Sequence, residues 1–252
     1  METWILLGGV GFLAGAVSGA TGFGFALVAT ALWGQYFEPQ RVTLLALVYM
    51  LALNIAYLPL FWRQIPWRRM LPYGLGCLPG VPLGAWALGV LPVQEARLAI
   101  GAVLMAYGGY MLWRRGTVQI LAWPPGRAWR ADLAVGFAAG VLGGLASLSG
   151  FLPTLWCALR SDDKMANRAL VQGFILLSGL WALVCVGQVV QPDEATAWQI
   201  LFGLPFVAAG GALGLYVFAR LNHAQFMRLV LALLVVCGAL MVVRAWPVVA
   251  GA

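Results

Sequence analysis

Three hydroxyl side chains lie within two short glycine-rich stretches of this sequence, where they could bind an anion. Thr21 belongs to Ala20-Thr21-Gly22-Phe23-Gly24, and Ser147 and Ser149 belong to Leu145-Ala146-Ser147-Leu148-Ser149-Gly150. Glycine weakens a helix, and a broken helix exposes backbone N–H groups at the positive end of its dipole. Hydroxyl groups beside such an end are further hydrogen-bond donors. These two stretches therefore predict a cradle for the oxygens of an anion.

The two stretches follow copies of one phrase. Residues 11–19 read GFLAGAVSG, and residues 136–144 read GFAAGVLGG. Duplicated, glycine-interrupted apolar segments in corresponding positions of two halves point to the binding site of a secondary transporter. We predict that the site lies where the copies meet; the alternative is that these residues only permit tight hairpin packing. The residues of the two breaks predicted to bind substrate are Gly19, Thr21, Gly22, Gly24, Gly144, Ser147, Ser149 and Gly150.

Two amide side chains inside apolar stretches are further candidates. Asn54 lies near the middle of the second stretch of the first half, and Gln172 lies near the cytoplasmic end of the corresponding stretch of the second half. An amide at such a position either contacts a ligand or joins two helices by a hydrogen bond. Both interpretations stay open for each residue.

The composition shows what kind of elements must position these residues. The chain is 63% hydrophobic and 9% charged, with a mean hydropathy of +0.91, whereas soluble domains carry about 25% charged residues. Long continuous apolar runs without alternation exclude a β-barrel and predict an all-α integral membrane protein. The basic residues lie in short loops, where they act as topology signals, so we reject binding to nucleic acid.

Eight apolar stretches follow each other along the chain. They cover about residues 4–34, 42–62, 71–90, 97–113, 133–159, 169–189, 197–219 and 225–243. The longest polar break predicts an N-terminal membrane repeat (1–113), a cytoplasmic linker (114–131) and a C-terminal membrane repeat (132–252). The third stretches resemble each other, because Gly80-xxx-Gly84 corresponds to Gly210-xxx-Gly214. Such spacing lets helix backbones approach closely.

Charge distribution favours re-entrant first segments. If every stretch crosses the membrane once, eight basic residues lie inside and seven outside. If stretches 4–34 and 133–159 each enter and return, twelve lie inside and three outside, which follows the positive-inside rule. The legs 4–17 and 25–34 are also too short to cross about 30 Å as helices. Each half then crosses an odd number of times, which makes the two repeats inverted. A long tilted helix with tolerated glycines is the competing picture.

The pattern resembles the TauE/SafE group of sulfite-exporter-like transporters over nearly the whole chain. The two GF-x-AG-xxx-G phrases, the breaks after them and the proline-then-glycine third stretches carry the resemblance. Two runs of the second half add to it, residues 148–156 (LSGFLPTLW) and residues 167–172 (NRALVQ). The resemblance implies transport of sulfite, sulfonates, related sulfur anions or small organic acids.

The placement of the acids bears on the direction of transport. All eight acids are expected at segment ends or in loops, and the single histidine, His223, in a loop. Proton relays and cation sites usually contain carboxylates or histidines inside the membrane, so we expect no metal and no cofactor. An interior-negative potential drives anions outward without coupling. We therefore expect an exporter of a small anion that works by alternating access, in the cell (inner) membrane.

Other functions remain as alternatives. A transporter of a non-sulfur organic acid or a lipid fits the same elements, and so does a non-transport membrane assembly protein. A hydrolase would need a base for the serines in Ser147-Leu148-Ser149-Gly150, and the only imidazole, His223, is predicted far from them. We therefore predict no enzyme activity. The predicted partners are the small anionic substrate and the lipid bilayer, and formation of a homodimer is left open.

Overall fold

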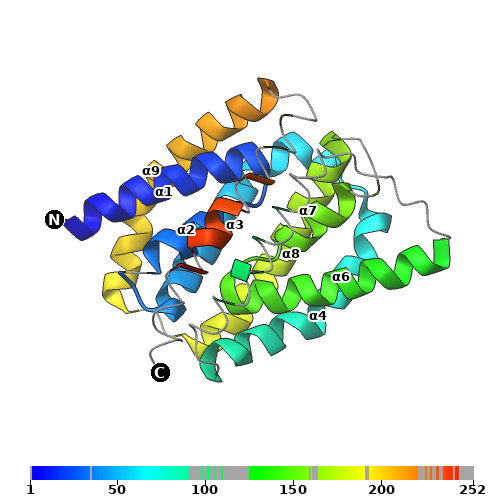
Figure 1. Ribbon diagram of the computed structural model, residues 1–252, viewed down its shortest axis with the longest axis horizontal. Coiled ribbons are helices and arrows are strands. Elements are labelled where there is room, and N and C mark those ends of the chain that lie inside the picture. Colours follow the sequence, from blue (N-terminus) through cyan, green and yellow to red (C-terminus); the bar gives the residue numbers. More distant parts are fainter. Residues whose placement is uncertain are drawn as a thin grey trace.

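The structure is a computed structural model in which the described residues are almost entirely helical (Figure 1). It describes residues 2–34, 36–90, 125–158, 160, 164–190 and 193–220, with isolated residues between 98 and 109 and between 225 and 243. No strand occurs among them. The helices are α1 (Glu2–Thr21), α2 (Phe25–Trp33), α3 (Pro39–Phe61) with a 3₁₀ turn (Trp62–Gln64), α4 (Trp67–Val90), α6 (Pro125–Ala146), α7 (Phe151–Ala158), α8 (Lys164–Val189) and α9 (Glu194–Arg220).

Five described helices are long and apolar enough to cross a membrane. They are α1 over Trp4–Thr21, α3 with its 3₁₀ turn over Pro39–Gln64, α4, α8 over Met165–Val189, and α9. The predicted fold class, an all-α multi-pass membrane protein, is confirmed. The stretches 97–113 and 225–243 and the first part of the predicted linker, 114–124, lie mostly outside the described residues. The rest of that linker, 125–131, forms the first turns of α6, and the division into two repeats and a linker stays a prediction.

The first segment of each half is broken where the glycine-rich stretches predict it. Residues 22–24 separate α1 from α2, and residues 147–150 separate α6 from α7. Helix α2 returns along α1, since a Cβ on Gly11 would lie 3.8 Å from the Trp33 ring. The predicted first leg, 4–17, is too short: α1 continues to Thr21, about 30 Å from its start at 1.5 Å per residue. The inverted relation of the two halves stays a prediction.

Helix α1 packs against α9 through a reciprocal series of small residues. A Cβ on Gly15 or Gly19 would come closer than 3.0 Å to the carbonyl oxygens of Val207 or Gly211 in α9. The contact is mutual, because Cβ atoms on α9 would approach carbonyls of α1 in the same way at Gly210 and Gly214. Small residues on both helices are therefore required for this backbone contact.

Helices α4 and α6 pack in the same way on the other side of the molecule (Figure 1). Glycines 76, 80 and 84 of α4 face backbone oxygens of α6, and glycines 136 and 144 of α6 face backbone oxygens of α4. The first segment of each half therefore packs on the third segment of the other half. The sequence singled out these segments, and the structure shows which of them are partners.

Helices α3 and α8 lie between the two pairs and run antiparallel. Leu51 of α3 approaches Gly179 of α8, and Phe61 lies 5.2 Å from the guanidinium carbon of Arg168. Later residues of α3 thus lie beside earlier residues of α8. Helix α2 is also interior, since its residues from 25 to 31 are all buried. A short helix that is apolar on every side fits a position enclosed by protein.

We expect Gly210→Ala to destabilise the protein and Gly9→Ala to leave it unchanged. A Cβ on Gly210 would meet backbone atoms of Phe12 closer than 3.0 Å, whereas a Cβ on Gly9 would meet nothing within 4 Å. Overpacking of this kind costs about 1–3 kcal/mol, and a chain of this length loses roughly 2–4 °C in Tm per kcal/mol. Thermal unfolding in detergent measures both variants. Equal midpoints for the two variants would contradict the backbone contact.

Candidate functional site

The first break is closed by the side chain of Thr21. Its Oγ1 donates to the carbonyl of Val17 at 2.8 Å and accepts from the backbone N–H of Gly24 at 3.1 Å. Gly22 has φ +89°, which only glycine adopts without strain. Gly24 is the N-cap of α2 and makes no side-chain cap. The Thr21 hydroxyl, which the sequence predicts as a donor to substrate, is therefore engaged in holding the turn.

The second break uses one serine and leaves the other without a partner. Ser147 has φ +58°, and its Oγ donates to the carbonyl of Thr43 in α3 at 2.9 Å. Ser149 is 2% exposed, and its Oγ has no hydrogen-bond partner in the part of the chain that the structure describes. Of the three predicted hydroxyls, Ser149 is thus the one that remains available to a ligand.

The two breaks meet inside the protein. A Cβ on Gly150 would lie 2.7 Å from the Cβ of Phe23, and 2.5 Å from Cδ1 of Ile175 in α8. The predicted meeting of the two breaks is therefore present, with Gly150 directly in the contact. Two other predicted residues lie in helix contacts next to the breaks: Gly19 packs against α9, and Gly144 packs against α4.

Each break is also held by a hydrogen bond from the second long helix of the opposite half, which is α3 or α8. Thr43, near the start of α3, donates to the carbonyl of Leu145 at 3.4 Å. Arg168, near the start of α8, donates from Nη2 to the carbonyl of Gly19 at 2.6 Å. The two residues occupy the same position in their helices, counted from Pro39 and Lys164. The Arg168 guanidinium in α8 thus occupies the position that the Thr43 hydroxyl occupies in α3.

Arg168 is a buried cation beside the first break that sequence reasoning misses. The positive-inside count places it in a cytoplasmic loop, but it lies in α8 and is 3% exposed. Its guanidinium carbon lies 3.8 Å from the centre of the Phe218 ring. Among the described residues, its Nε and Nη1 have no hydrogen-bond partner. The spacing Arg168-xxx-Gln172 was the available signal, because residues four apart share a helix face.

Neutral polar groups accompany this arginine. Gln172 is 6% exposed, and neither its Nε2 nor its Oε1 has a partner within the described ranges. The Tyr57 hydroxyl, from α3, likewise has none there, and Phe61, one turn later in α3, lies 5.2 Å from the Arg168 guanidinium carbon. We call Arg168, Gln172 and Tyr57 the Arg168 cluster. It adjoins the first break, because Gly22 lies against the Arg168 side chain.

Asn54 is only partly engaged. Its Nδ2 donates to the carbonyl of Met50 one turn earlier at 2.8 Å, and its Oδ1 has no partner among the residues described. Asn54 precedes Tyr57 by three residues, which places both on one side of α3. Among the described residues, the bond that Nδ2 donates stays within α3 and does not join two helices. The proposed contact of Asn54 with a ligand stays a prediction.

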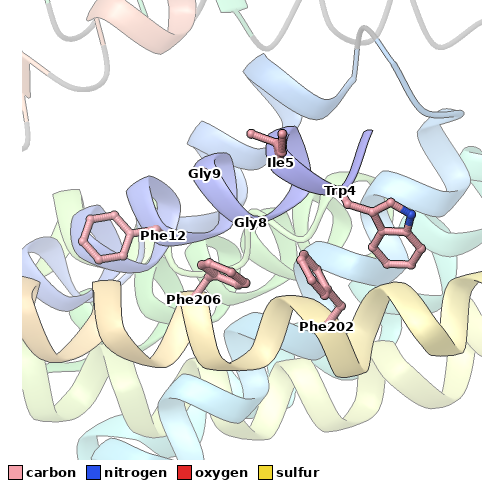
Figure 2. Close-up of a pocket in the computed structure, with 7 residues that line it drawn as sticks. All are labelled: Trp4, Ile5, Gly8, Gly9, Phe12, Phe202 and Phe206. Atoms are coloured by element: carbon pink, nitrogen blue, oxygen red, sulfur yellow. The ribbon is translucent and has the colours of Figure 1, made fainter. Parts of the chain in front are cut away.

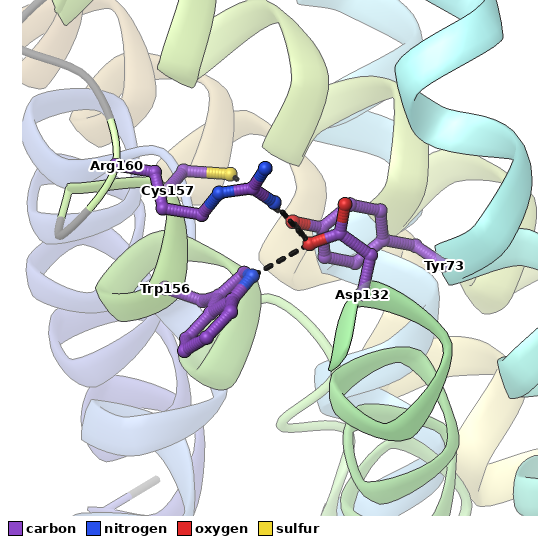
Figure 3. A network of polar contacts seen from close by, with 5 residues as sticks. All are labelled: Tyr73, Asp132, Trp156, Cys157 and Arg160. Carbon is purple, nitrogen blue, oxygen red and sulfur yellow. Dashed lines mark hydrogen bonds and ion pairs between the residues drawn. The ribbon is translucent and has the colours of Figure 1, made fainter. Parts of the chain in front are cut away.

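A second polar network surrounds Asp132, as Figure 3 shows. Tyr73 and Trp156 donate to its Oδ1 at 2.9 and 2.6 Å, and Arg160 forms an ion pair with the same oxygen. Asp132 lies about two turns inside α6 and is 5% exposed, so its predicted place at a segment end is wrong. The network connects α7 to α6 and α4, and it stabilises the hairpin that α6 and α7 form.

Two grooves on the described part of the molecule are lined mainly by apolar side chains. One, of about 550 Å³, runs between α1 and α9 and is lined by Trp4, Ile5, Gly8, Gly9, Phe12, Phe202 and Phe206 (Figure 2). A second, of about 520 Å³, lies between α3 and α9, with Leu53, Tyr57 and Val207 among its lining residues. Their chemistry suits lipid chains. Arg168 and the residues of the two breaks are not among the lining residues of either groove, whereas Tyr57 of the Arg168 cluster lines the second one.

Comparison with known proteins gives one family. A family model described as "Sulfite exporter TauE/SafE" matches residues 7–241. No curated protein and no solved structure matches the chain.

We expect Asp132→Asn to destabilise the protein, with Asp193→Asn as its matched control. The first substitution leaves Arg160 without its counter-charge in a mostly buried site, where breaking a pair costs about 3 kcal/mol or more. Asp193 pairs with Arg41 at 2.7 Å, but both side chains are exposed, and such pairs contribute about 0–1 kcal/mol. Hydrogen bonds from Thr196 and the Arg41 charge lower the pKa of Asp193, so this control pair is ionised at neutral pH.

Thermal unfolding of the two variants in the same detergent measures the difference. A large loss for Asp132→Asn beside a small change for Asp193→Asn is the expected result. Equal losses would show that the Asp132 network contributes no more than a surface ion pair.

Proposed function

Because the chain belongs to the TauE/SafE sulfite exporter family, we propose that it exports a small sulfur-containing anion across the cell (inner) membrane. The family is one of membrane transporters, and the five apolar helices agree with a multi-pass protein. The substrate is sulfite, a sulfonate or a related anion. It binds between the two broken segments and crosses by alternating access.

The observation that carries this proposal is the contact between the two breaks. Non-helical backbone at membrane depth is tolerated only where protein buries it or where it lines a cavity. Here Gly150 lies against Phe23, with the Ser149 hydroxyl buried nearby in the same break. A donor that is buried without a partner is costly unless a ligand or water satisfies it. An oxyanion provides the acceptor that this hydroxyl needs.

The glycine contacts suggest which parts move. The pairs α1–α9 and α4–α6 are each joined by direct backbone contact, so each pair moves as a unit. The breaks are the joints between these units and the short helices α2 and α7. Rocking of one unit against the other exposes the contact between the breaks first to one side of the membrane and then to the other.

The direction of transport follows from the charge of the substrate. An interior-negative potential supplies about 2.3 kcal/mol per 100 mV for each negative charge that leaves the cell. Asp132, the buried acid in the described part of the chain, is already compensated by Arg160. We therefore assign it a structural role and not that of a proton carrier. Outward transport of the anion proceeds without coupling to protons.

A hydrolase is the less favoured reading. Ser147 Oγ donates to a backbone carbonyl, which leaves it unsuited as a nucleophile activated by a base. Ser149 has no partner within the described residues, and a base is therefore not seen beside it. His223 lies outside the described residues. Membership of a transporter family agrees with a protein that is not an enzyme.

In proteoliposomes, sulfite flux is expected to be electrogenic. A potential imposed with a potassium gradient and valinomycin should accelerate flux toward the positive side, because the field acts on the charge of the anion. Collapse of a pH gradient at fixed potential should change the rate little once protonation of sulfite is controlled. Protein-free liposomes give the background. Flux that follows the pH gradient and ignores voltage would contradict uncoupled anion export.

Thr21→Val and Ser149→Ala are expected to behave differently, although both remove a hydroxyl. Thr21→Val loses the hydrogen bonds that close the first break, so it should lower stability by about 1 kcal/mol and weaken sulfite binding. Ser149→Ala loses no hydrogen bond among the described residues, so stability should be kept and binding should weaken roughly 3- to 10-fold. Thermal unfolding and sulfite titration measure the two effects. Unchanged binding in Ser149→Ala would exclude Ser149 from the site.

A further inference from the structure

Among the residues that the structure describes, no counter-charge balances Arg168. Its Nη2 donates to the Gly19 carbonyl, and the Phe218 and Phe61 rings cover the guanidinium at 3.8 and 5.2 Å. Within the described ranges, the N–H groups on Nε and Nη1 have no hydrogen-bond partner and no acidic side chain pairs with Arg168. A buried cation without a counter-ion is unfavourable, and an anion bound from outside the chain would supply the negative charge that the described residues do not provide.

Arg160 shows the contrast within the same protein. Both arginines belong to the region between α7 and the first turns of α8, but Arg160 is paired with Asp132. Asp132 also accepts from Tyr73 and Trp156, so that network is complete. The Arg168 cluster has the same kinds of donor, a guanidinium and a phenol, together with the Gln172 amide, and it lacks the carboxylate. The missing component is an anion.

We propose that Arg168 is the counter-charge of the transported anion, with Gln172 and Tyr57 completing an oxyanion subsite beside the first break. This rests on the proposed function and identifies the ligand class, a monoanion whose head group carries several oxygens. The guanidinium binds oxygens through Nε and Nη1, and the Gln172 amide and Tyr57 hydroxyl donate to the others. Arg168 and a bound monoanion together carry no net charge, so the loaded site remains buried at low cost.

The cluster lies where movement of the breaks would reach it. Arg168 holds the last turn of α1 through the Gly19 carbonyl, and its side chain lies against Gly22 at the point of positive φ. Tyr57 belongs to α3, and its hydroxyl lies against Gly211 of α9, where a Cβ would clash with it. An anion bound by this cluster therefore contacts α8, α3 and the α1–α9 pair at once. Binding stabilises the arrangement in which these elements are together.

The experiment compares ligand binding by Arg168→Gln and by Arg220→Gln in purified protein. Arg220 is an exposed arginine that stacks on Tyr216 at 4.1 Å, so its substitution removes the same charge and a similar ring contact. The probes are sulfite, methanesulfonate and dimethyl sulfone, the last being a neutral molecule of nearly the same shape as methanesulfonate. Affinity is measured by titration calorimetry, and stability by thermal unfolding without ligand.

We expect Arg168→Gln to weaken sulfite and methanesulfonate binding by about 10- to 100-fold, as for loss of hydrogen bonds to a charged group. Arg220→Gln should bind both as the wild type does, and dimethyl sulfone should bind none of the proteins measurably. Arg168→Lys keeps the charge and loses the planar fork, so its affinity should fall between those of the wild type and Arg168→Gln.

Gln172→Leu separates a binding role from a structural one. The Gln172 amide is buried without partners in the described structure, so an apolar side chain of similar size should raise Tm in the absence of ligand. The same substitution should weaken sulfite binding roughly 3- to 10-fold, because it removes a donor from the subsite. A residue that serves folding alone would not raise Tm while lowering affinity.

The outcomes distinguish the two proposals. If the wild type binds sulfite or methanesulfonate and the folded Arg168→Gln variant binds them equally well, the role of Arg168 is overturned and export of an anion stands. If the wild type binds no anion, both proposals fall. A Tm of Arg168→Gln far below that of Arg168→Lys, with equal anion affinity in both, also overturns the proposal, because Arg168 then serves only the fold.

Discussion

Direct backbone contact between helices is the constraint on which the rest of this structure depends. Lipid tails offer no hydrophobic drive for helices to associate, so close packing has to hold them together. Glycines on both α1 and α9, and on both α4 and α6, bring carbonyl oxygens to positions that any Cβ would occupy. These contacts fix the ends of α1 and α6, and the positions of the two breaks follow from them.

The breaks show how a chain interrupts a helix in an apolar environment without leaving its backbone unsatisfied. Thr21 closes the first break with bonds to Val17 and Gly24, and Ser147 anchors the second break to Thr43. Arg168 donates to a carbonyl near the end of α1, and Thr43 donates to a carbonyl near the end of α6. Once these requirements are met, the groups that remain free among the described residues are few. Several of them belong to Ser149 and the Arg168 cluster, which is why we propose the anion there; others belong to Trp33, Asn54 and Gln199.

Arg160 and Arg168 differ in whether a carboxylate of the described structure balances their charge. Arg160 and Asp132 neutralise each other, and aromatic donors satisfy the rest of the carboxylate. Arg168 is surrounded by rings and amide groups and, among the described residues, has no carboxylate partner. The first arrangement stabilises the closed hairpin at all times. In our proposal, a bound anion completes the second, so its stability would depend on substrate.

The sequence by itself determined the spans, the two breaks and the glycine spacings, because each depends on composition or on residues close together in the chain. The spans follow from apolar length, and the breaks at residues 22–24 and 147–150 follow from local clusters of glycine and hydroxyl residues. Only the tertiary structure decided that Ser149 has no hydrogen-bond partner among the described residues, and that Asp132 and Arg168 are buried. Those outcomes depend on contacts between segments about 25 to 150 residues apart, as in the bond of Arg168 to Gly19. The count of basic residues placed Arg168 in a solvent-exposed loop because it follows a polar segment. The packing of α8 against the first break buries it within the protein.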